Sequence, residues 1–138
     1  MKKAAKFLIL VLSVSGFGAG AALALAQGEA ANLLSSLEPG LWQFKAVGGG
    51  APGTPVRQLC VKNTGKLVQI QHGVRPCDHY VVRGNAATLT VSYSCKGAGQ
   101  GLTSIRKESS RLIHIDSQGI SGNGPFSFTV EGRRTGPC

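Results

Sequence analysis

The chain has 138 residues, a formal net charge of +9, 20 glycines and four cysteines. This length suits one domain rather than two. Only 6% of the residues are aromatic and 15% are charged, and this composition excludes collagen, coiled-coil and multi-pass membrane proteins.

Residues 1–26 have the pattern of a secretory signal peptide. Met1–Lys6 is basic, Phe7–Ser15 is apolar, and Ala24–Ala26 matches the small-x-small sequence of a cleavage site. A retained membrane anchor is the alternative, but glycines interrupt the apolar run, which ends in that site. We therefore expect cleavage near Ala26, which leaves 112 residues with a net charge of +6, periplasmic or secreted and without a transmembrane anchor.

Residues 27–40 are predicted to be a leader or a short helix. Leu33, Leu34 and Leu37 fall on one face of a helix that Pro39-Gly40 would end. The segment is either a helix that docks on the domain or a flexible leader.

Strand patterns dominate residues 41–138, which we expect to form a single β domain. Leu41–Ala46 alternates apolar and polar residues, so Trp42 and Phe44 should face the core. The next elements are a Gly/Pro-rich loop over Gly48–Pro55, a short strand over Arg57–Val61, one helical turn or irregular stretch over Lys66–Gln71, and a loop over His72–Cys77.

The clearest pattern is a hairpin. His79–Arg83 is predicted as a strand, Gly84-Asn85 as a two-residue turn, and Ala86–Cys95 as the returning strand. In the returning strand apolar residues alternate with Thr and Ser, so one face should lie in the core and the other in water.

Three further strands are predicted before the C-terminus. Their segments are a turn at Lys96–Gln100, strands at Leu102–Glu108 and Arg111–Asp116, a loop at Ser117–Pro125, a strand at Phe126–Glu131 and a basic tail at Gly132–Cys138. No helix is long enough for a parallel crossover. The fold class is therefore all-β: an antiparallel meander of about seven strands, closed as a small barrel or folded as a sandwich.

The four cysteines predict two disulfides. Cys60, Cys77, Cys95 and Cys138 follow the cleavage site, and an even number of cysteines in an exported protein indicates disulfide bonding. Three pairings are open, of which we favour the sequential one, Cys60–Cys77 and Cys95–Cys138. Metal binding is the weaker interpretation, because the sequence has no Cys-x-x-Cys.

Motifs for catalysis are weak. Gly119–Asn123 resembles a nucleophile elbow around Ser121 but lacks the closing glycine. Gly97–Gly101 resembles a phosphate loop but lacks the Gly-Lys-Ser/Thr ending. Both segments are better interpreted as turns, and we predict no catalytic residue, metal or cofactor.

Histidine is the most plausible reactive side chain, and His72, His79 and His114 are the three present. His72 and His79 flank Cys77-Asp78, which would suit a small metal site or an acid/base pair. No regular element fixes their geometry, so the favoured interpretation is that they lie at the surface or at strand ends.

Basic residues cluster only near the C-terminal half of the domain. Arg106, Lys107, Arg111, Arg133 and Arg134 are candidate contacts for an anionic envelope component, such as acidic lipid head groups, lipopolysaccharide or an acidic protein. Nucleic acid is not expected, because the protein is exported and its single tryptophan belongs to the core. A solvated basic surface without a partner is the simpler alternative.

The sequence resembles a family of small exported proteobacterial proteins, domain of unknown function 3617. The resemblance covers about residues 38–138. It rests on Leu41-Trp42 after Pro39-Gly40, on the spaced cysteines, and on the ending Arg134-Thr135-Gly136-Pro137-Cys138. It implies a periplasmic location and disulfides, and it supplies no activity or catalytic residue.

The sequence thus favours a non-enzymatic binding or envelope-associated protein. Its ligand would be a small apolar molecule in a barrel interior or an anionic partner on a basic face. The alternative is a periplasmic inhibitor of an envelope hydrolase such as a lysozyme, acting through loops at Gly48–Pro55 or Gly119–Pro125. A hydrolase or metal enzyme is the third and weakest hypothesis.

Overall fold

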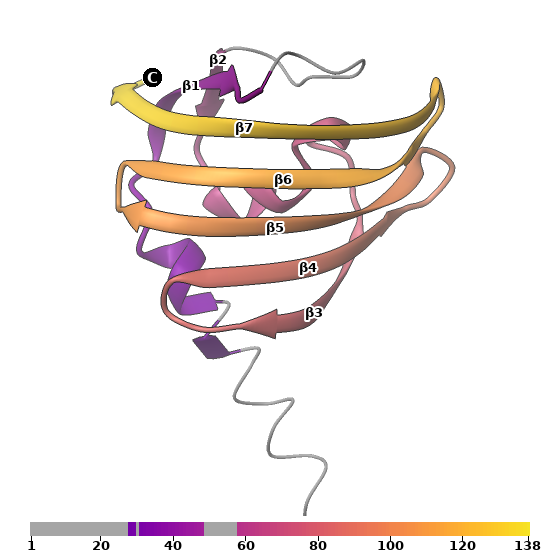
Figure 1. Ribbon diagram of the computed structural model, residues 1–138, viewed down its shortest axis with the longest axis horizontal. Helices are drawn as coiled ribbons and strands as arrows, with labels where there is room; N and C mark the ends of the chain where they lie inside the picture. The colour runs from indigo at the N-terminus through magenta and orange to yellow at the C-terminus, as the bar shows by residue number, and fades with distance from the viewer. Residues whose placement is uncertain (1–27, 30, 49–57) are drawn as a thin grey trace, which may run out of the picture.

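The structure is a computed structural model that describes residues 28–29, 31–48 and 58–138. The predicted signal peptide and nearly all of the predicted Gly48–Pro55 loop lie outside these residues. The all-β prediction is confirmed: seven antiparallel strands form one sheet in the order β2-β1-β7-β6-β5-β4-β3 (Figure 1). The strands are β1 (Gly40–Ala46), β2 (Gln58–Val61), β3 (Asp78–Gly84), β4 (Thr88–Cys95), β5 (Gly99–Ser109), β6 (Leu112–Ser121) and β7 (Gly124–Gly136).

The sheet is open, so the expected closure into a barrel or sandwich is wrong. β2 and β3 form its two edges and each pairs with a single neighbour. One face, here called the inner face, is covered by the 3₁₀ helix η1 (Thr64–His72) and by the N-terminal helix at residues 31–35. These helices fill the place that a second sheet or a closing barrel wall would take.

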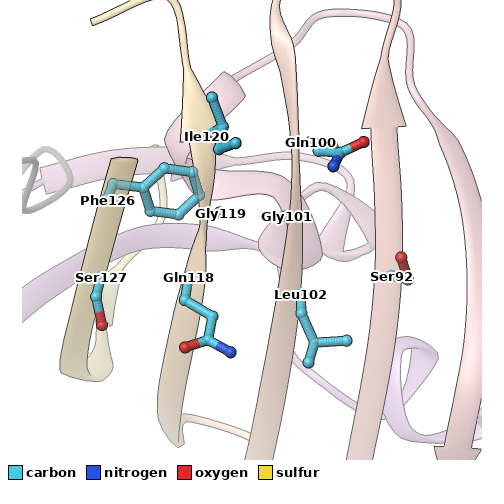
Figure 2. Close-up of a pocket in the computed structure, with 9 residues that line it drawn as sticks. All are labelled: Ser92, Gln100, Gly101, Leu102, Gln118, Gly119, Ile120, Phe126 and Ser127. Carbon is cyan, nitrogen blue, oxygen red and sulfur yellow. The ribbon is translucent and has the colours of Figure 1, made fainter. Parts of the chain in front are cut away.

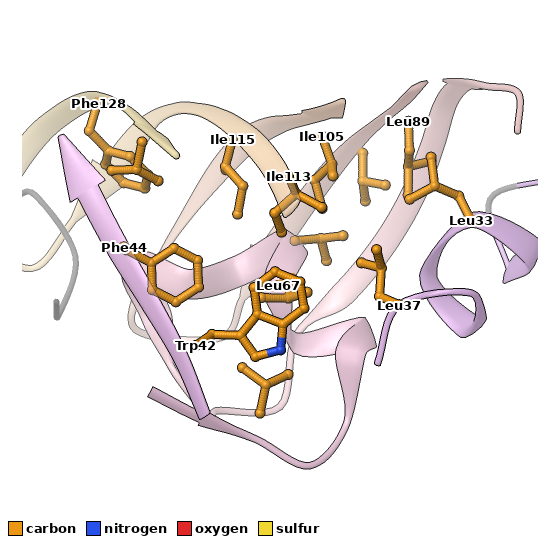
Figure 3. Close-up of a cluster of buried hydrophobic side chains, with 14 of the residues drawn as sticks. Leu33, Leu37, Trp42, Phe44, Leu67, Leu89, Ile105, Ile113, Ile115 and Phe128 are labelled. Atoms are coloured by element: carbon orange, nitrogen blue, oxygen red, sulfur yellow. The ribbon is translucent and has the colours of Figure 1, made fainter. Parts of the chain in front are cut away.

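The inner face carries the hydrophobic core (Figure 3). Trp42 and Phe44 face it as predicted and are 0% and 2% exposed. Ile113 and Ile115 on β6 are both fully buried. The strand periodicity of two therefore placed Trp42 and Phe44 correctly. The other buried members of the cluster are Leu33, Leu37, Val61, Leu67, Val68, Leu89, Val91, Ile105, Phe126, Phe128 and Val130.

The N-terminal helix at residues 31–35 docks on this core. Leu33 and Leu37 are buried, and the Thr64 hydroxyl of η1 donates a hydrogen bond to Leu34 O at 2.7 Å. The buried Trp42 indole donates to Glu38 O at 3.0 Å, so its polar atom is satisfied. None of the helices in the described ranges is long and apolar enough to span a membrane.

Strands β6 and β7 are longer than predicted. The expected loop at Ser117–Pro125 is mostly strand, with a turn at Gly122-Asn123, and the expected tail at Gly132–Cys138 is strand as far as Gly136. The sequence pattern missed the continuation of β6 because polar residues point inward there. Ser117 is buried, and its hydroxyl lies 2.8 Å from that of Thr103 on β5, so the two hydroxyls satisfy each other.

Both disulfides are present, but the sequential pairing is wrong. Cys60 is bonded to Cys138 and Cys77 to Cys95, with Cα separations of 5.5 Å and 4.1 Å. The strand order explains this, because Cys60 on β2 and Cys77 before β3 lie at opposite edges of the sheet. Cys77 instead continues the β3–β4 ladder, in which Asp78 is paired with Ser94, and so lies opposite Cys95.

Candidate functional site

His72 is buried, contrary to the expectation of a surface or strand-end histidine, and is 7% exposed. Its Nε2 lies 3.1 Å from Ala98 O, and because a carbonyl only accepts, Nε2 carries the proton. Nδ1 then accepts from the Tyr93 hydroxyl at 3.1 Å. Burial raises the pKa of Tyr93, so the phenol stays protonated and able to donate. His72 therefore has a structural role.

His79 lies near the start of β3 and belongs to a different hydrogen-bond network. The fully buried Gln69 amide donates to Gly73 O and Arg75 O, each at 2.8 Å. Its Oε1 is therefore the acceptor for His79 Nε2, also at 2.8 Å. Burial lowers the pKa of His79, and the charge of Lys66 lowers it further, so the ring is neutral at pH 7.

The two weak catalytic motifs lie in turns or strands, where their residues contact the backbone or neighbouring side chains. The Ser121 hydroxyl donates to Gly124 O at 3.3 Å in the turn after β6. Gly99 has a φ of +120° and packs against Ile120 O and the His72 ring. Within the described residues no group of three or more His, Cys, Asp or Glu side chains is arranged to hold a metal ion. His114 lies 3.8 Å from a Glu108 carboxylate oxygen.

The predicted basic residues come together at one end of the sheet, but carboxylates neutralise many of them. Arg133 lies opposite Leu112 in the ladder, and the Arg134 amide donates to Arg111 O at 2.9 Å. Lys107 Nζ donates to the Ser36 hydroxyl at 2.7 Å. The ion pairs are Arg106 with Glu108, Arg133 with Glu131, and Arg111 and Arg134 with Glu38.

Glu38 shows that part of this cluster serves the fold. It accepts a hydrogen bond from Ser110 at 2.9 Å and one from Arg111 Nε at 2.8 Å. These contacts lower the pKa of Glu38, with the Ser110 hydrogen bond as the largest cause. Arg134 is only 15% exposed and donates to Pro39 O at 2.7 Å. Arg111 and Arg134 therefore fasten the N-terminal segment to the sheet.

A separate hollow of about 420 Å³ lies between the helices and the β3–β4 hairpin. This volume is within the range of small-molecule sites, about 300–1,000 Å³. The walls come from three parts of the chain: the N-terminal helix, η1 and the inner face of β3 and β4. We call it the helix-side hollow; its apolar lining is Ala31, Leu34, Val68, Val81, Leu89 and Val91.

The rim of the helix-side hollow is polar and carries the cation of Lys66. Asn63, Gly65 and His79 complete the lining, which contains no carboxylate. Asn63 is committed to the start of η1, where its side chain accepts from Gly65 N at 2.9 Å. Among the residues that the structure describes, the Lys66 ammonium donates a single hydrogen bond, to Arg75 O at 3.4 Å. The hollow thus combines an apolar wall with an ammonium group available to an anion.

No motif in the sequence predicts this site. Lys66 lies in a segment predicted as a helical turn or irregular stretch and Val81 in a predicted strand, and no motif joins the two. The lining includes residues from the N-terminal helix to Val91, so only the packing of η1 and the N-terminal helix on the sheet brings them together. The one signal in the sequence was the apolar face of residues 33–37.

No protein-family model matches the chain, and no curated protein or solved structure is similar to it. The resemblance to domain of unknown function 3617 stays a prediction.

Proposed function

We propose that the protein is an exported, non-enzymatic binding protein that holds an anionic amphiphile of the cell envelope in the helix-side hollow. The ligand has an apolar chain and a carboxylate or phosphate head group. The observation that carries the proposal is the apolar hollow with Lys66 at its rim and no carboxylate in its lining.

Export is supported by the signal-peptide pattern at residues 1–26 and by the disulfides. Both cysteine pairs are bonded and no cysteine is free. Disulfides form and persist in oxidising compartments such as the periplasm. Cell fractionation tests this part: the full chain is expected in the periplasm or the medium, and a chain that lacks residues 2–26 in the cytoplasm. Equal distribution of the two chains would contradict export.

The chemistry of the hollow supports the ligand class. Leu34 and Val81 are only partly buried by the protein, so an alkyl chain that covers them gains about 25 cal/mol for each Å² removed from water. An anionic head group near Lys66 would neutralise the ammonium charge, because the lining contains no carboxylate that could do so. The Nε2 proton of the neutral His79 ring is already donated to Gln69 Oε1 at 2.8 Å, so Lys66 is the group of this rim that binds the head group.

The other two hypotheses from the sequence have less support. The basic residues Arg106, Lys107, Arg111, Arg133 and Arg134 remain candidate contacts for an anionic partner, but acidic neighbours pair with four of them. The lysozyme-inhibitor hypothesis needs a loop that projects from the domain. The segment Gly119–Pro125 does not form such a loop, because most of it belongs to β6 and β7. The Gly48–Pro55 segment lies almost entirely outside the described residues.

Titration calorimetry with dodecyl phosphate, below its micelle concentration, tests the proposal. We expect saturable binding with one site per protein, and at least tenfold weaker binding by Lys66→Gln, which corresponds to about 1.4 kcal/mol. Lys45→Gln is the matched control, because Lys45 is an exposed lysine on β1 outside the hollow. Neutral dodecyl maltoside should bind less tightly than dodecyl phosphate to the wild type.

Equal affinities of Lys66→Gln and Lys45→Gln for dodecyl phosphate would refute the role of the hollow. Loss of lysozyme activity on addition of the purified protein, without binding of dodecyl phosphate, would instead support the inhibitor hypothesis.

A further inference from the structure

The face of the sheet opposite the helices, here called the outer face, carries a second hollowed region (Figure 2). Two adjoining hollows of about 520 and 290 Å³ share Leu102, Gln118 and Ser127 in their linings. They therefore form one continuous shallow trough over strands β4 to β7. Figure 2 shows the side chains of Gln118 and Leu102 on neighbouring strands, with Ser92 and Ser127 on either side of them.

The strand register arranges these four side chains in one row across the sheet. Ser92 is paired with Leu102, Leu102 with Gln118, and Gln118 with Ser127. Neighbouring strands are about 4.8 Å apart, so a polar or an apolar side chain occurs about every 4.8 Å along the row. In the next row, Gln100 is paired with Ile120, which places an amide beside an apolar side chain again.

The polar groups of the trough fall into two sets. Those in the row of Ser104, Asp116 and Thr129 already have side-chain partners: the Thr90 and Ser104 hydroxyls lie 3.0 Å apart, and Thr129 donates to Asp116 at 2.6 Å. Gln100 and Gln118 have no such side-chain partner in the part of the chain that the structure describes. Their amides are therefore free to bond with a ligand in place of water.

The lining also defines the ligand by charge and shape. It contains no Lys or Arg, and its one carboxylate, Asp116, already accepts from Thr129. A phosphate-bearing ligand would find no cation there. Leu102 and Ile120 are 37% and 53% exposed, so apolar patches alternate with amides and hydroxyls along the trough.

From this arrangement we propose that the trough binds a neutral oligosaccharide chain that lies across strands β4 to β7. Sugar hydroxyls bond with the amides of Gln100 and Gln118 and with the Ser92 and Ser127 hydroxyls, and the C–H faces of the rings pack on Leu102 and Ile120. The site is on the opposite face of the sheet from the helix-side hollow and does not depend on the proposed amphiphile.

Nuclear magnetic resonance titration of the disulfide-bonded protein with two probes, chitotetraose and cellotetraose, tests the proposal. We expect at least one of them to shift the backbone amide signals of β4 to β7 in a saturable manner. The affinity should not change between low and high salt, because no ion pair is formed. Gln118→Ala and Leu102→Ala should each weaken binding at least fivefold.

Gln43→Ala is the matched control, because Gln43 is a glutamine on the outer side of β1, away from the trough. It should bind like the wild type. The proposal is overturned if neither tetrasaccharide shifts any signal at millimolar concentration, or if Gln118→Ala and Gln43→Ala bind equally well. Binding that disappears at high salt would also overturn it, because it would indicate a charged ligand. Unchanged melting temperatures of the variants exclude unfolding as the cause of any loss.

Discussion

The two faces of the sheet are built from the same strands yet have opposite compositions. On β6 the inner face carries Ile113 and Ile115, both fully buried, while the outer face carries His114 and Asp116. The inner face is covered by η1 and the N-terminal helix, and no described residue forms a second layer on the outer face. Because successive side chains of a strand point to opposite faces, the residues that pack in the core are separated from those that contact solvent.

This separation bears on where function can reside. Substitutions on the inner face act on folding first, because nearly every apolar residue there belongs to one packed cluster. The helix-side hollow lies at the margin of that cluster, whereas the trough lies on the face that contributes little to packing. The trough can therefore be altered at lower cost in stability than the hollow.

The largest effect that we predict is a loss of stability on removal of a disulfide, and it does not depend on which face of the sheet a side chain occupies. The exposed Cys60–Cys138 bridge closes a separation of 78 residues, so Cys60→Ala/Cys138→Ala should lose about 4 kcal/mol of unfolding free energy in the chain-entropy estimate. Urea denaturation of the oxidised proteins measures it. A loss below about 1 kcal/mol would show that this bridge contributes little.

The pairing itself is tested by the variant Cys60→Ala/Cys77→Ala. In the observed pairing this variant retains two cysteines without their partners and should show two free thiols with Ellman's reagent. The sequential pairing would instead leave Cys95 and Cys138 bonded and show none.

The contrast between the faces is tested directly by a pair of substitutions on β6. Ile115→Ala removes a fully buried side chain and should cost about 2–5 kcal/mol. Gln118→Ala on the outer face should change the unfolding free energy by less than about 0.5 kcal/mol. Equal costs in urea denaturation would show that the outer face is also packed, for instance against a second copy of the chain.

Two glycines, Gly99 at the start of β5 and Gly122 in the turn between β6 and β7, should differ in how well they tolerate a side chain. A Cβ at Gly99 would approach Ile120 O, and the φ of Gly99 is +120°, so Gly99→Ala should cost about 1–3 kcal/mol. Gly122 in the following turn has open space around its Cα, and Gly122→Ala should leave the melting temperature nearly unchanged. Similar melting temperatures for the two variants would contradict this role of Gly99.

The smallest effect concerns protonation of His79. Because burial and Lys66 lower its pKa, the neutral ring is favoured by folding. The stability that it contributes is present above the unfolded pKa, near 6.5, and is lost as the pH falls through the lower folded value. An NMR titration should give a pKa below 6.5, and Lys66→Gln should raise it, with Lys45→Gln as the control. A pKa at or above 6.5 in the wild type would contradict the predicted environment.

The fold was predictable where side chains alternate in polarity. Trp42 and Phe44, and the β3–β4 hairpin, follow directly from that pattern. It failed at Ser117, because a buried hydroxyl that bonds to that of Thr103 looks like a solvent-facing residue in the sequence. It also failed to predict the open sheet, since closure depends on where the helices pack.

The disulfide pairing and the candidate sites were harder to predict than the strands. The pairing of Cys60 with Cys138 depends on the order of strands in the sheet, which the spacing of cysteines along the chain does not reveal. Lys66 is one of many dispersed bases in the sequence, and only its position beside Val81 and His79 in the hollow distinguishes it from the others. Gln118 and Leu102 are neighbours only through the register of β5 and β6.

The nested arrangement of the two bridges has a consequence for a chain exposed to proteases. Cys60–Cys138 encloses Cys77–Cys95 in the sequence. A single cut at any bond between Cys60 and Cys138 therefore leaves the two fragments covalently joined. With the sequential pairing, a cut between Cys77 and Cys95 would have separated them. A nicked molecule thus remains one covalent unit until a reductant opens every bridge that spans the cut: both bridges for a cut between Cys77 and Cys95, and the outer bridge alone for a cut elsewhere between Cys60 and Cys138.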